Sequence, residues 1–301
     1  MSRRQRSGRL GRSEAASGLL LVSPTALYAL LLLAAPLATI LAFSFWSQDY
    51  LTIDRSFTLK NYQEAFASQA NGDMSLYLEL MFRSLRISGA VTVATVLLAF
   101  PMAYFVSFHV APSRKSMWIF LITIPFWTSY LIRVFLWKVI LGYNGVFNTT
   151  LQGVGIIDEP LTFILYNANA VVITLAHAYA PFAILPIFVA LEKIDRSLLE
   201  ASRDLGENHI TTFLRVTLPL AMPGVVAAVL IVFIPTIGDY VTPRLVGGPG
   251  GQMIANMIQT QFLKLNNAPM GAALAVLAML MVGAISVIFV MLNRRFLGGQ
   301  K

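Results

Sequence analysis

Six long apolar runs alternate with polar segments along the chain. The first run carries no charge between Ala15 and Gln48, which is longer than the apolar part of a signal peptide. A helix needs about 20 apolar residues to cross the hydrocarbon core of a bilayer. The spans expected on this measure cover residues 19–45, 87–110, 117–141, 168–191, 218–241 and 270–292. The pattern therefore predicts an all-α membrane protein with six transmembrane helices.

The positions of Lys and Arg predict which side each polar segment faces. With six spans both termini lie on one side, which would hold fourteen basic residues against six on the other. Cytoplasmic loops are enriched in Lys and Arg, so the basic side is expected to be cytoplasmic. The predicted layout is a basic cytoplasmic tail at 1–18, a periplasmic loop at 46–86, a membrane core at 87–293 with a cytoplasmic loop at 192–217, and a cytoplasmic tail at 294–301. Within the periplasmic loop, residues 59–68 and 75–82 are expected to form short interfacial helices.

Composition narrows the class of function. The chain is 57% hydrophobic and only 12% charged, whereas soluble domains carry about 25% charged residues. The chain has a net charge of +8, and its basic residues lie at the ends of apolar runs. This position favours the membrane surface over nucleic acid as the partner of these residues. Three widely spaced His and no Cys predict no metal site. The chain has no GxxxxGK[ST] phosphate loop, so any ATP hydrolysis is expected to come from another chain.

A polar segment, Glu200–Gly224, lies between two apolar runs on the predicted cytoplasmic side and reads EASRDLGENHITTFLRVTLPLAMPG. Ser197 and Glu200 have the spacing of a capping box, in which Ser caps the start of a helix and Glu reaches back to it. Gly206 suits the position after a helix, where the backbone often adopts the left-handed conformation. A second helix is expected to start near Thr211. From these residues alone the segment is either an ordinary amphipathic loop or a surface for a soluble partner.

The spacing within this segment resembles the signature cytoplasmic loop of ABC-importer permeases. That loop reads Glu-Ala-Ala/Ser, three residues, Gly, nine residues, an aliphatic residue, one residue and Leu-Pro. The resemblance implies a type I ABC-importer permease fold with a cytoplasmic coupling helix that docks in a groove of a separate ATPase subunit. Glu200 would make a polar contact to the ATPase, Ala201 would allow close approach, and Gly206 would permit the turn. The candidate coupling residues are Glu200, Ala201, Ser202, Arg203, Asp204, Gly206, Leu218 and Pro219.

Further blocks resemble the spermidine/putrescine type of permease within this family. They are residues 125–133 (PFWTSYLIR), 145–148 (GVFN), 233–243 (FIPTIGDYVTP) and 253–259 (MIANMIQ). With the coupling loop, the resemblance covers about residues 80–295. It implies a path for a small organic cation, with polyamine as the expected substrate. Related permeases for opines, other small amines or carboxylates are the alternative, because they could carry the same blocks.

The same resemblance implies the rest of the assembly. Two ATPase subunits, a second and different permease subunit, and a periplasmic substrate-binding protein are the expected partners in a bacterial inner membrane. The ATPase would use ATP and Mg, and this chain would bind no cofactor. A stand-alone secondary transporter is the rival class. It would need ion-coupling carboxylates near the membrane midplane and usually an inverted repeat, and neither is found in the sequence.

The candidate substrate-path residues are Trp127, Tyr130, Asp239 and Tyr240. Asp239 is the only acid within or at the edge of a predicted span, which favours a role in substrate admission or gating. The alternative is a helix-end carboxylate that lies in water or pairs with Arg244. Tyr130 belongs to a stripe at helical spacing that would place it on one face with Phe126, Arg133 and Trp137. Such a stripe forms either an interfacial aromatic belt or part of a substrate site.

Overall fold

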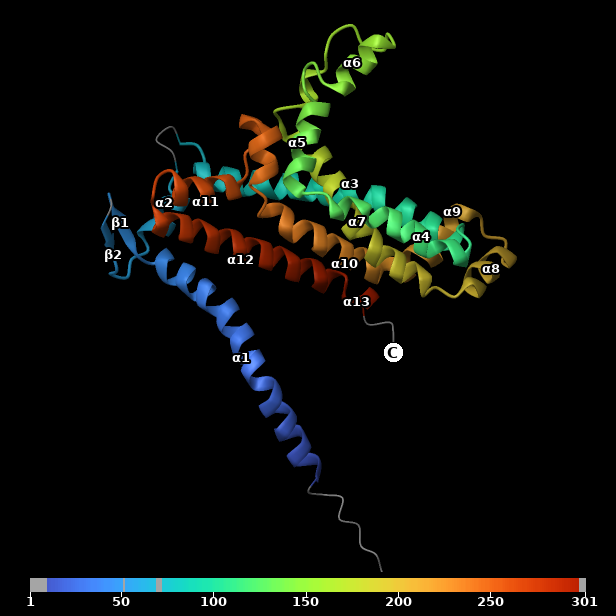
Figure 1. Ribbon diagram of the computed structural model, residues 1–301, viewed down its shortest axis with the longest axis horizontal. Coiled ribbons are helices and arrows are strands. Elements are labelled where there is room, and N and C mark those ends of the chain that lie inside the picture. Colours follow the sequence, from blue (N-terminus) through green and yellow to red (C-terminus); the bar gives the residue numbers. More distant parts are fainter. Residues whose placement is uncertain (1–9, 51, 69–71, 298–301) are drawn as a thin grey trace, which may run out of the picture.

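The computed structural model describes residues 10–50, 52–68 and 72–297. Within them, five helices are long and apolar enough to cross a membrane, and a bent pair of helices supplies a sixth candidate span. The five long helices are α1 (Leu10–Ser44), α3 (Leu76–Phe108), α7 (Ala168–Glu192), α10 (Leu218–Ile237) and α12 (Ala268–Leu292), and Figure 1 shows their arrangement. The prediction of an all-α membrane protein with six spans is confirmed.

Shorter elements connect these helices. On the predicted periplasmic side they include the antiparallel pair β1 (Ser47–Asp49) and β2 (Thr52–Asp54), α2 (Lys60–Phe66), α6 (Val146–Gly153), η2 (Thr162–Ile164), η4 (Pro243–Gly247), η5 (Pro249–Gly251) and α11 (Ile254–Leu263). The bent span comprises α4 (Pro112–Thr123), η1 (Ile124–Trp127) and α5 (Tyr130–Ile140). The predicted cytoplasmic elements are α8 (Arg196–Asp204), α9 (His209–Thr212), η3 (Phe213–Thr217) and α13 (Arg294–Leu297).

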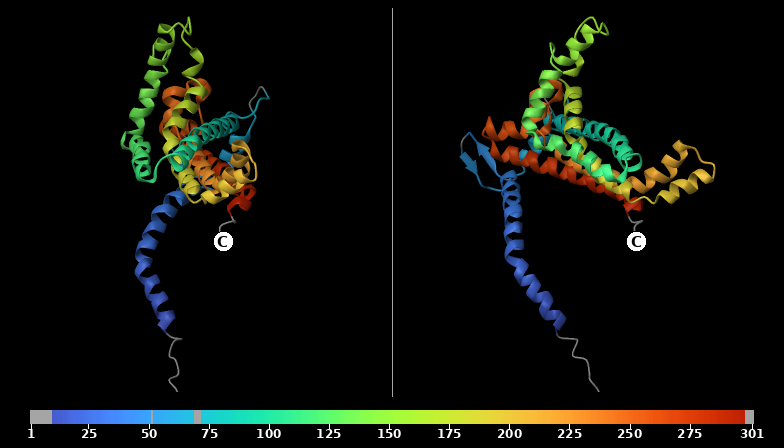
Figure 2. Two further views of the ribbon diagram at one scale, coloured as in Figure 1. Left: turned by 90° about the vertical axis from the view of Figure 1, so that its right-hand side faces the viewer. Right: turned by 45° about the vertical axis from the view of Figure 1, so that its right-hand side comes forward.

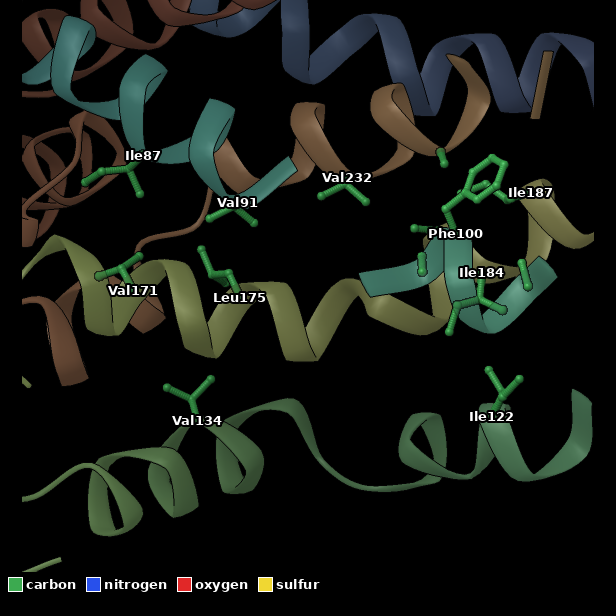
Figure 3. Packing of buried hydrophobic residues seen from close by; sticks show 14 of the residues in the cluster. Ile87, Val91, Phe100, Ile122, Val134, Val171, Leu175, Ile184, Ile187 and Val232 are labelled. Carbon is green, nitrogen blue, oxygen red and sulfur yellow. The ribbon is translucent and has the colours of Figure 1, made fainter. Parts of the chain in front are cut away.

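The main core lies where α3, α7 and α10 pack together. Val91 of α3, Leu175 of α7 and Val232 of α10 are completely buried, and Figure 3 shows their side chains converging. Small residues let two of these helices approach closely. A Cβ added at Gly224 of α10 would come 2.5 Å from the Cβ of Ala190 on α7. Glycine at this position therefore brings the backbones of α7 and α10 together, as small residues do between membrane helices.

Helix α1 separates from this core. The C-terminal end of α1 meets α12, and the N-terminal part of α1 extends away from the rest of the molecule (Figures 1 and 2). None of its 18-residue apolar window is buried. A surface this apolar must face lipid or another protein, because water solvates it poorly.

The second span starts earlier than the sequence predicted. Helix α3 runs without interruption from Leu76, so residues 75–82 are its first turns and not a separate interfacial helix. Ser75 caps it by accepting a hydrogen bond from the Tyr77 N–H at 3.2 Å. Arg83 pairs with Glu79 one turn away, which lets the helix continue into the polar region. By contrast, α2 falls within the predicted helical stretch 59–68.

The third span is broken, at a point where the sequence places Pro125 inside the predicted span. The helices on the two sides of the break are bent by 87°. Pro125 lacks an N–H group for the helix ladder, Thr128 adopts an extended backbone conformation, and Ser129 is also outside the helical region. Phe126 therefore does not lie on the helix that carries Tyr130, and its predicted place on that face is wrong. Its ring packs against Phe182 of α7 instead, with centroids 4.4 Å apart.

Beyond α5 the chain makes an outward excursion that includes α6 and returns to α7 (Figure 2). Buried Asn148 organises it. The Asn148 side-chain amide donates to the carbonyls of Gly142 and Tyr143 at 3.2 Å each, and its Oδ1 accepts from the Leu161 N–H at 2.9 Å. The two ends of the excursion are thereby held together.

Candidate coupling loop and substrate path

Helix α8 carries Glu200 to Asp204, the first signature residues of the predicted cytoplasmic loop. Its cap is Asp195, whose Oδ1 accepts a hydrogen bond from the Ser197 N–H at 3.0 Å. The predicted capping box of Ser197 and Glu200 is therefore wrong, because the helix starts one residue before Ser197. The hydrogen bond from the Ser197 backbone stabilises the charged carboxylate and lowers the pKa of Asp195.

The end of α8 agrees with the sequence prediction. Gly206 has φ +84°, in the left-handed region. Its N–H donates to the Arg203 carbonyl at 2.8 Å, and the Glu207 N–H donates to the Ser202 carbonyl at 3.2 Å. These bonds close the helix in the manner of a glycine C-terminal motif. No atom lies within 4 Å of an added Cβ, so glycine is favoured here by backbone conformation and not by crowding.

A second helix follows the turn and leads into the membrane. It starts at His209, two residues before the predicted Thr211, and is capped by the Asn208 side chain, which accepts from the Thr211 N–H at 2.8 Å. The hydroxyls of Ser202 and Thr212 lie 3.0 Å apart and join the two helices. The chain continues through the π-helical turn η3 into α10. Leu218 and Pro219 form the first turn of α10, and Leu218 packs against the main core.

The exposed residues of α8 divide between two faces. Leu198, Ala201 and Leu205 lie on one face and are exposed, with Leu205 83% exposed. Glu200 and Arg203 lie on the other face, beside the C-terminal end of α3. The remaining signature residues differ in burial, since Asp204 is exposed and Ser202 is buried. The candidate coupling residues therefore do not form one continuous surface.

At the opposite end of the bundle, the structure brings two candidate path residues together. The phenolic O–H of Tyr130, in the first turn of α5, donates to Asp239 Oδ2 at 2.5 Å. The Tyr130 oxygen also lies 2.6 Å from the Thr242 hydroxyl. Asp239 Oδ1 accepts from the Val241 N–H at 2.9 Å, and the residue is only 8% exposed. Both alternatives considered for Asp239, a carboxylate in water and a pair with Arg244, are therefore wrong in this structure.

The other two candidate path residues lie differently. Trp127 is 82% exposed beside the break in the third span. Tyr240 is partly exposed, and its carbonyl accepts a hydrogen bond from Asn256 Nδ2 at 2.8 Å. Sequence reasoning singled out neither Asn256 nor Thr242 individually. Both were inside the blocks that carried the resemblance, and that was the only signal available for them.

The predicted stripe on the third span consists of three hydrogen-bond donors on α5. Besides Tyr130, Arg133 donates to the carbonyls of Pro125 and Thr128 at the break and to the Ala178 carbonyl of α7 at 3.3 Å. One turn further, Trp137 Nε1 donates to His177 Nδ1 at 3.1 Å. These bonds join α5 to its neighbours.

Among the described residues no group of three or more His, Cys, Asp or Glu is placed to hold a metal ion.

Known proteins resemble this chain in both sequence and fold. Residues 74–297 match the family described as binding-protein-dependent transport system inner membrane component. The spermidine/putrescine transport system permease protein PotB of Haemophilus influenzae is 38% identical over 80% of this chain and 82% of its own. PotB of Escherichia coli is 33% identical over 84% of this chain and 90% of its own. The residues that match the family include both the coupling loop and the segment around Asp239.

Solved structures show the same fold. A bacterial ABC transporter that imports the acidic polysaccharide alginate has a TM-score of 0.67 at 17% identity, covering 95% of this chain and 99% of its own. The same kind of transporter in complex with an alginate-bound periplasmic protein gives a TM-score of 0.69 at 17% identity, covering 96% and 98%. The fold of this chain is therefore that of an ABC-importer permease. The chain belongs to the binding-protein-dependent transport system inner membrane component family, whose members are non-enzymatic, multi-pass permease subunits of ABC importers.

Proposed function

We propose that this chain forms part of the translocation path for a linear polyamine of the spermidine/putrescine class. The observation that carries the proposal is the identity of 33–38% to spermidine/putrescine permeases over most of the chain. The buried Asp239 supports it, because a carboxylate at the end of a span can neutralise an ammonium group that leaves water. Tyr130 holds this carboxylate and presents an aromatic ring beside it.

The proposed path is located near the break between α4 and α5. Tyr130 and Asp239 form its polar centre, while the exposed Trp127 and Tyr240 supply aromatic faces on its outer side. Ammonium groups bind well to aromatic faces when they are partly desolvated. In this proposal a polyamine ammonium group takes the place of the Tyr130 O–H beside Asp239, so substrate arrival loosens the link between α5 and the segment after α10.

ATP hydrolysis in partner subunits would act on the coupling loop, at the opposite end of the molecule from Asp239. In the proposed assembly two ATPase subunits bind two permeases, this chain and a different homologous one, and a periplasmic binding protein delivers the substrate. ATP and Mg bind the ATPase, and this chain holds no cofactor. The exposed face of α8 formed by Leu198, Ala201 and Leu205 would dock in the ATPase, with Glu200 adding a polar contact at its edge. Both termini would lie in the cytoplasm, as the excess of Lys and Arg on that side favours.

The test is transport by the complete importer. The chain is reconstituted in proteoliposomes with its second permease, its ATPase and its binding protein, and uptake of radiolabelled putrescine and spermidine is measured with and without ATP. ATP-dependent polyamine uptake supports the proposal. Uptake of an opine, another small amine or a carboxylate in its place would assign the alternative substrate. Proton- or sodium-driven uptake by this chain alone would rule out the ABC mechanism.

A further inference from the structure

Four helices meet at a polar junction on the predicted cytoplasmic side of the molecule. Glu192 is the last residue of α7, and its Oε1 accepts hydrogen bonds from the Ser107 hydroxyl of α3 and the Lys115 ammonium of α4, each at 2.6 Å. The Arg196 guanidinium, in the first turn of α8, donates to the Ser107 carbonyl at 3.2 Å. Three hydrogen bonds therefore connect α3, α4 and α7 to one another and to the start of α8.

The ion pair in this junction differs from the others in the described chain. Of the three ion pairs among the residues that the structure describes, one lies within α3 and one within the predicted cytoplasmic loop. The pair of Lys115 and Glu192 is the one that joins two different spans. The Lys115 side chain is only 13% exposed, so its ammonium group is largely removed from water. Such a group is costly without its carboxylate, and the pair therefore holds the start of α4 against α7.

The remaining contacts of α4 lie further along the helix. Ile122, near its C-terminal end, is the one residue of α4 that is buried, and it belongs to the main core (Figure 3). The ring of Trp118, in the middle of the helix, meets the Phe105 ring of α3 edge-on, with centroids 5.7 Å apart. The first turn of α4 is otherwise exposed. Lys115 therefore provides the attachment of this turn to the neighbouring spans.

The other end of α4 leads to the break in the third span. Helix α4 has 12 residues and is about 18 Å long. Beyond it the chain bends by 87° into α5, whose first residue, Tyr130, donates to Asp239. The non-helical residues Thr128 and Ser129 lie between the two helices, and a few such residues can absorb a change of angle. Helix α4 therefore extends from the polar junction to the proposed substrate path.

We propose that Glu192 is a positioning residue for energy coupling, which makes the first half of the broken third span follow the coupling loop. The inference rests on the proposed function, because it takes α8 as the helix that the ATPase displaces. Arg196 then transmits this displacement to the end of α3, and Glu192 carries α4 along with α7 through Lys115. Helix α5 is held separately by its bond to Asp239. The angle at the break consequently changes when the ATPase closes.

A purely structural role for the ion pair predicts a different result. A structural pair is needed equally in every state of the importer, whereas a coupling contact determines how far α4 moves between two states. Lys115→Met removes the ammonium group and keeps an apolar side chain of similar length, so no poorly solvated lysine is left unpaired. Glu192 retains its hydrogen bond from Ser107 in this variant. The movement of α4 is therefore the measurement that separates the two roles.

The test measures distances between spin labels in the complete importer. The chain contains no Cys, so introduced cysteines give unique label positions once the partner subunits are freed of Cys. Labels at Met117 and Val139 span the break, and labels at Met117 and Val189 span the junction, and all three side chains are exposed. Between the nucleotide-free and the vanadate-trapped state, the first distance should shift by about 2 Å or more. The second distance should stay constant.

Variants assign this behaviour to the junction. In Lys115→Met we expect the shift across the break to be lost and the distance between α4 and α7 to vary between the two states. The charge-exchanged double variant, Lys115→Glu with Glu192→Lys, should restore the wild-type behaviour. Lys193→Met is the matched control, because Lys193 is exposed and forms no ion pair within the described chain. It should behave like the wild type.

Transport provides a second readout. Polyamine uptake per ATP hydrolysed should fall severalfold in Lys115→Met, with an unchanged KM for the substrate-loaded binding protein. The thermal unfolding temperature of Lys115→Met should match that of Lys193→Met. This combination supports a role in coupling, since a general loss of stability would lower uptake and ATP hydrolysis together.

Three results would overturn the proposal. The first is an equal shift across the break in the wild type and in Lys115→Met, and the second is a wild type in which that distance is the same in both states. The third is a loss of the shift that charge exchange does not restore, accompanied by a lower unfolding temperature, which would assign Glu192 to the fold alone. The labels report movement without substrate, so these results decide the role of Glu192 whichever substrate the importer carries. Failure of the wild type to take up polyamine would contradict the proposed substrate instead.

Discussion

The Tyr130 phenolic oxygen lies 2.5 Å from Asp239 Oδ2, although the two residues are 109 positions apart in the chain. This bond joins the start of α5 to the segment that follows α10. Thr242 adds a second contact at 2.6 Å from the same phenolic oxygen. The broken third span and the end of the fifth span therefore meet at one buried carboxylate. A movement that separates α5 from α10 must first replace the hydrogen bond to Asp239.

The variant Tyr130→Phe tests this link. It keeps the ring but removes the O–H from Asp239, which leaves a buried carboxylate short of a donor at a cost of about 1–3 kcal/mol. We expect lower thermal stability and binding-protein-stimulated ATP hydrolysis that depends less on substrate. Tyr143→Phe is the control, because Tyr143 is an exposed tyrosine in the outward excursion. Identical behaviour of the two variants would show that the Tyr130 hydroxyl does not control the separation of α5 from α10.

Asp239→Asn tests the charge at the same place. The amide keeps nearly the same shape but cannot neutralise an ammonium group, so uptake of spermidine should fall more than uptake of a neutral amine analogue. A loss of about 1.5–3 kcal/mol in the interaction would lower polyamine uptake at limiting substrate by roughly ten- to a hundredfold. Uptake is measured in proteoliposomes of the complete importer. Equal losses for charged and neutral substrates would show that Asp239 has a structural role only.

Gly206 provides a test of the coupling loop. Alanine at φ +84° costs about 1–2 kcal/mol, so Gly206→Ala should loosen the end of α8. Gly155→Ala is a close control, because Gly155 has φ +76° and also has no atom within 4 Å of an added Cβ. The two changes carry similar strain, but only the first is in the coupling loop. We expect Gly206→Ala to lower ATPase retention on purification and uptake, and Gly155→Ala to preserve both. Equal losses would indicate a general folding defect.

The sequence predicted the features that depend on residues close together in the chain better than those that depend on residues far apart. Apolar runs and basic flanks predicted the spans, because crossing a bilayer is a local requirement of length and composition. Spacing also predicted the turn at Gly206, because the end of a helix depends on a few neighbouring residues. The cap at Asp195 was missed because Ser197 and Glu200 offered an equally good local pattern. Pro125 marked an interruption of the third span, but Pro223 and Pro235 lie inside an unbroken α10, so proline alone does not show which span breaks.

The pairing of Tyr130 with Asp239 depends on tertiary structure that no local pattern contains. Both residues were candidates, one for its place in an aromatic stripe and one as an acid at the edge of a span. Their contact depends on the 87° bend, which turns the start of α5 toward the segment after α10. The sequence therefore indicated the participants but not the arrangement. Asn256, which was not singled out from the sequence, stabilises the Tyr240 backbone from α11.

Arg133 is expected to hold the bend itself. Its guanidinium donates to the Ala178 carbonyl on α7 and to the carbonyls of Pro125 and Thr128 at the break. Lysine keeps the charge but lacks the planar fork that serves several acceptors at once. Arg133→Lys should therefore lower thermal stability by about 1–3 kcal/mol, because carbonyls are left without donors, and should reduce uptake. Lys138→Arg on the same helix is the reverse control and should change neither. Unaltered uptake in Arg133→Lys would show that the charge alone is sufficient.

Close approach of α7 and α10 gives a final prediction that concerns the core. An added Cβ at Gly224 would lie 2.5 Å from both the Cβ of Ala190 and the carbonyl oxygen of Pro186, and 3.1 Å from the Ile187 Cα. Two of these three atoms belong to the backbone, so relief requires the helices to separate. Overpacking of this kind costs about 1–3 kcal/mol, and Gly224→Ala should lower the thermal unfolding temperature of the purified importer. Gly283→Ala in α12 is the control, because no atom lies within 4 Å of its added Cβ, and helix propensity favours alanine there. If both variants unfolded at the same temperature, α7 and α10 would not need glycine at their crossing. A fall confined to Gly224→Ala would show that the closeness of these two helices determines the stability of the core that positions Asp239.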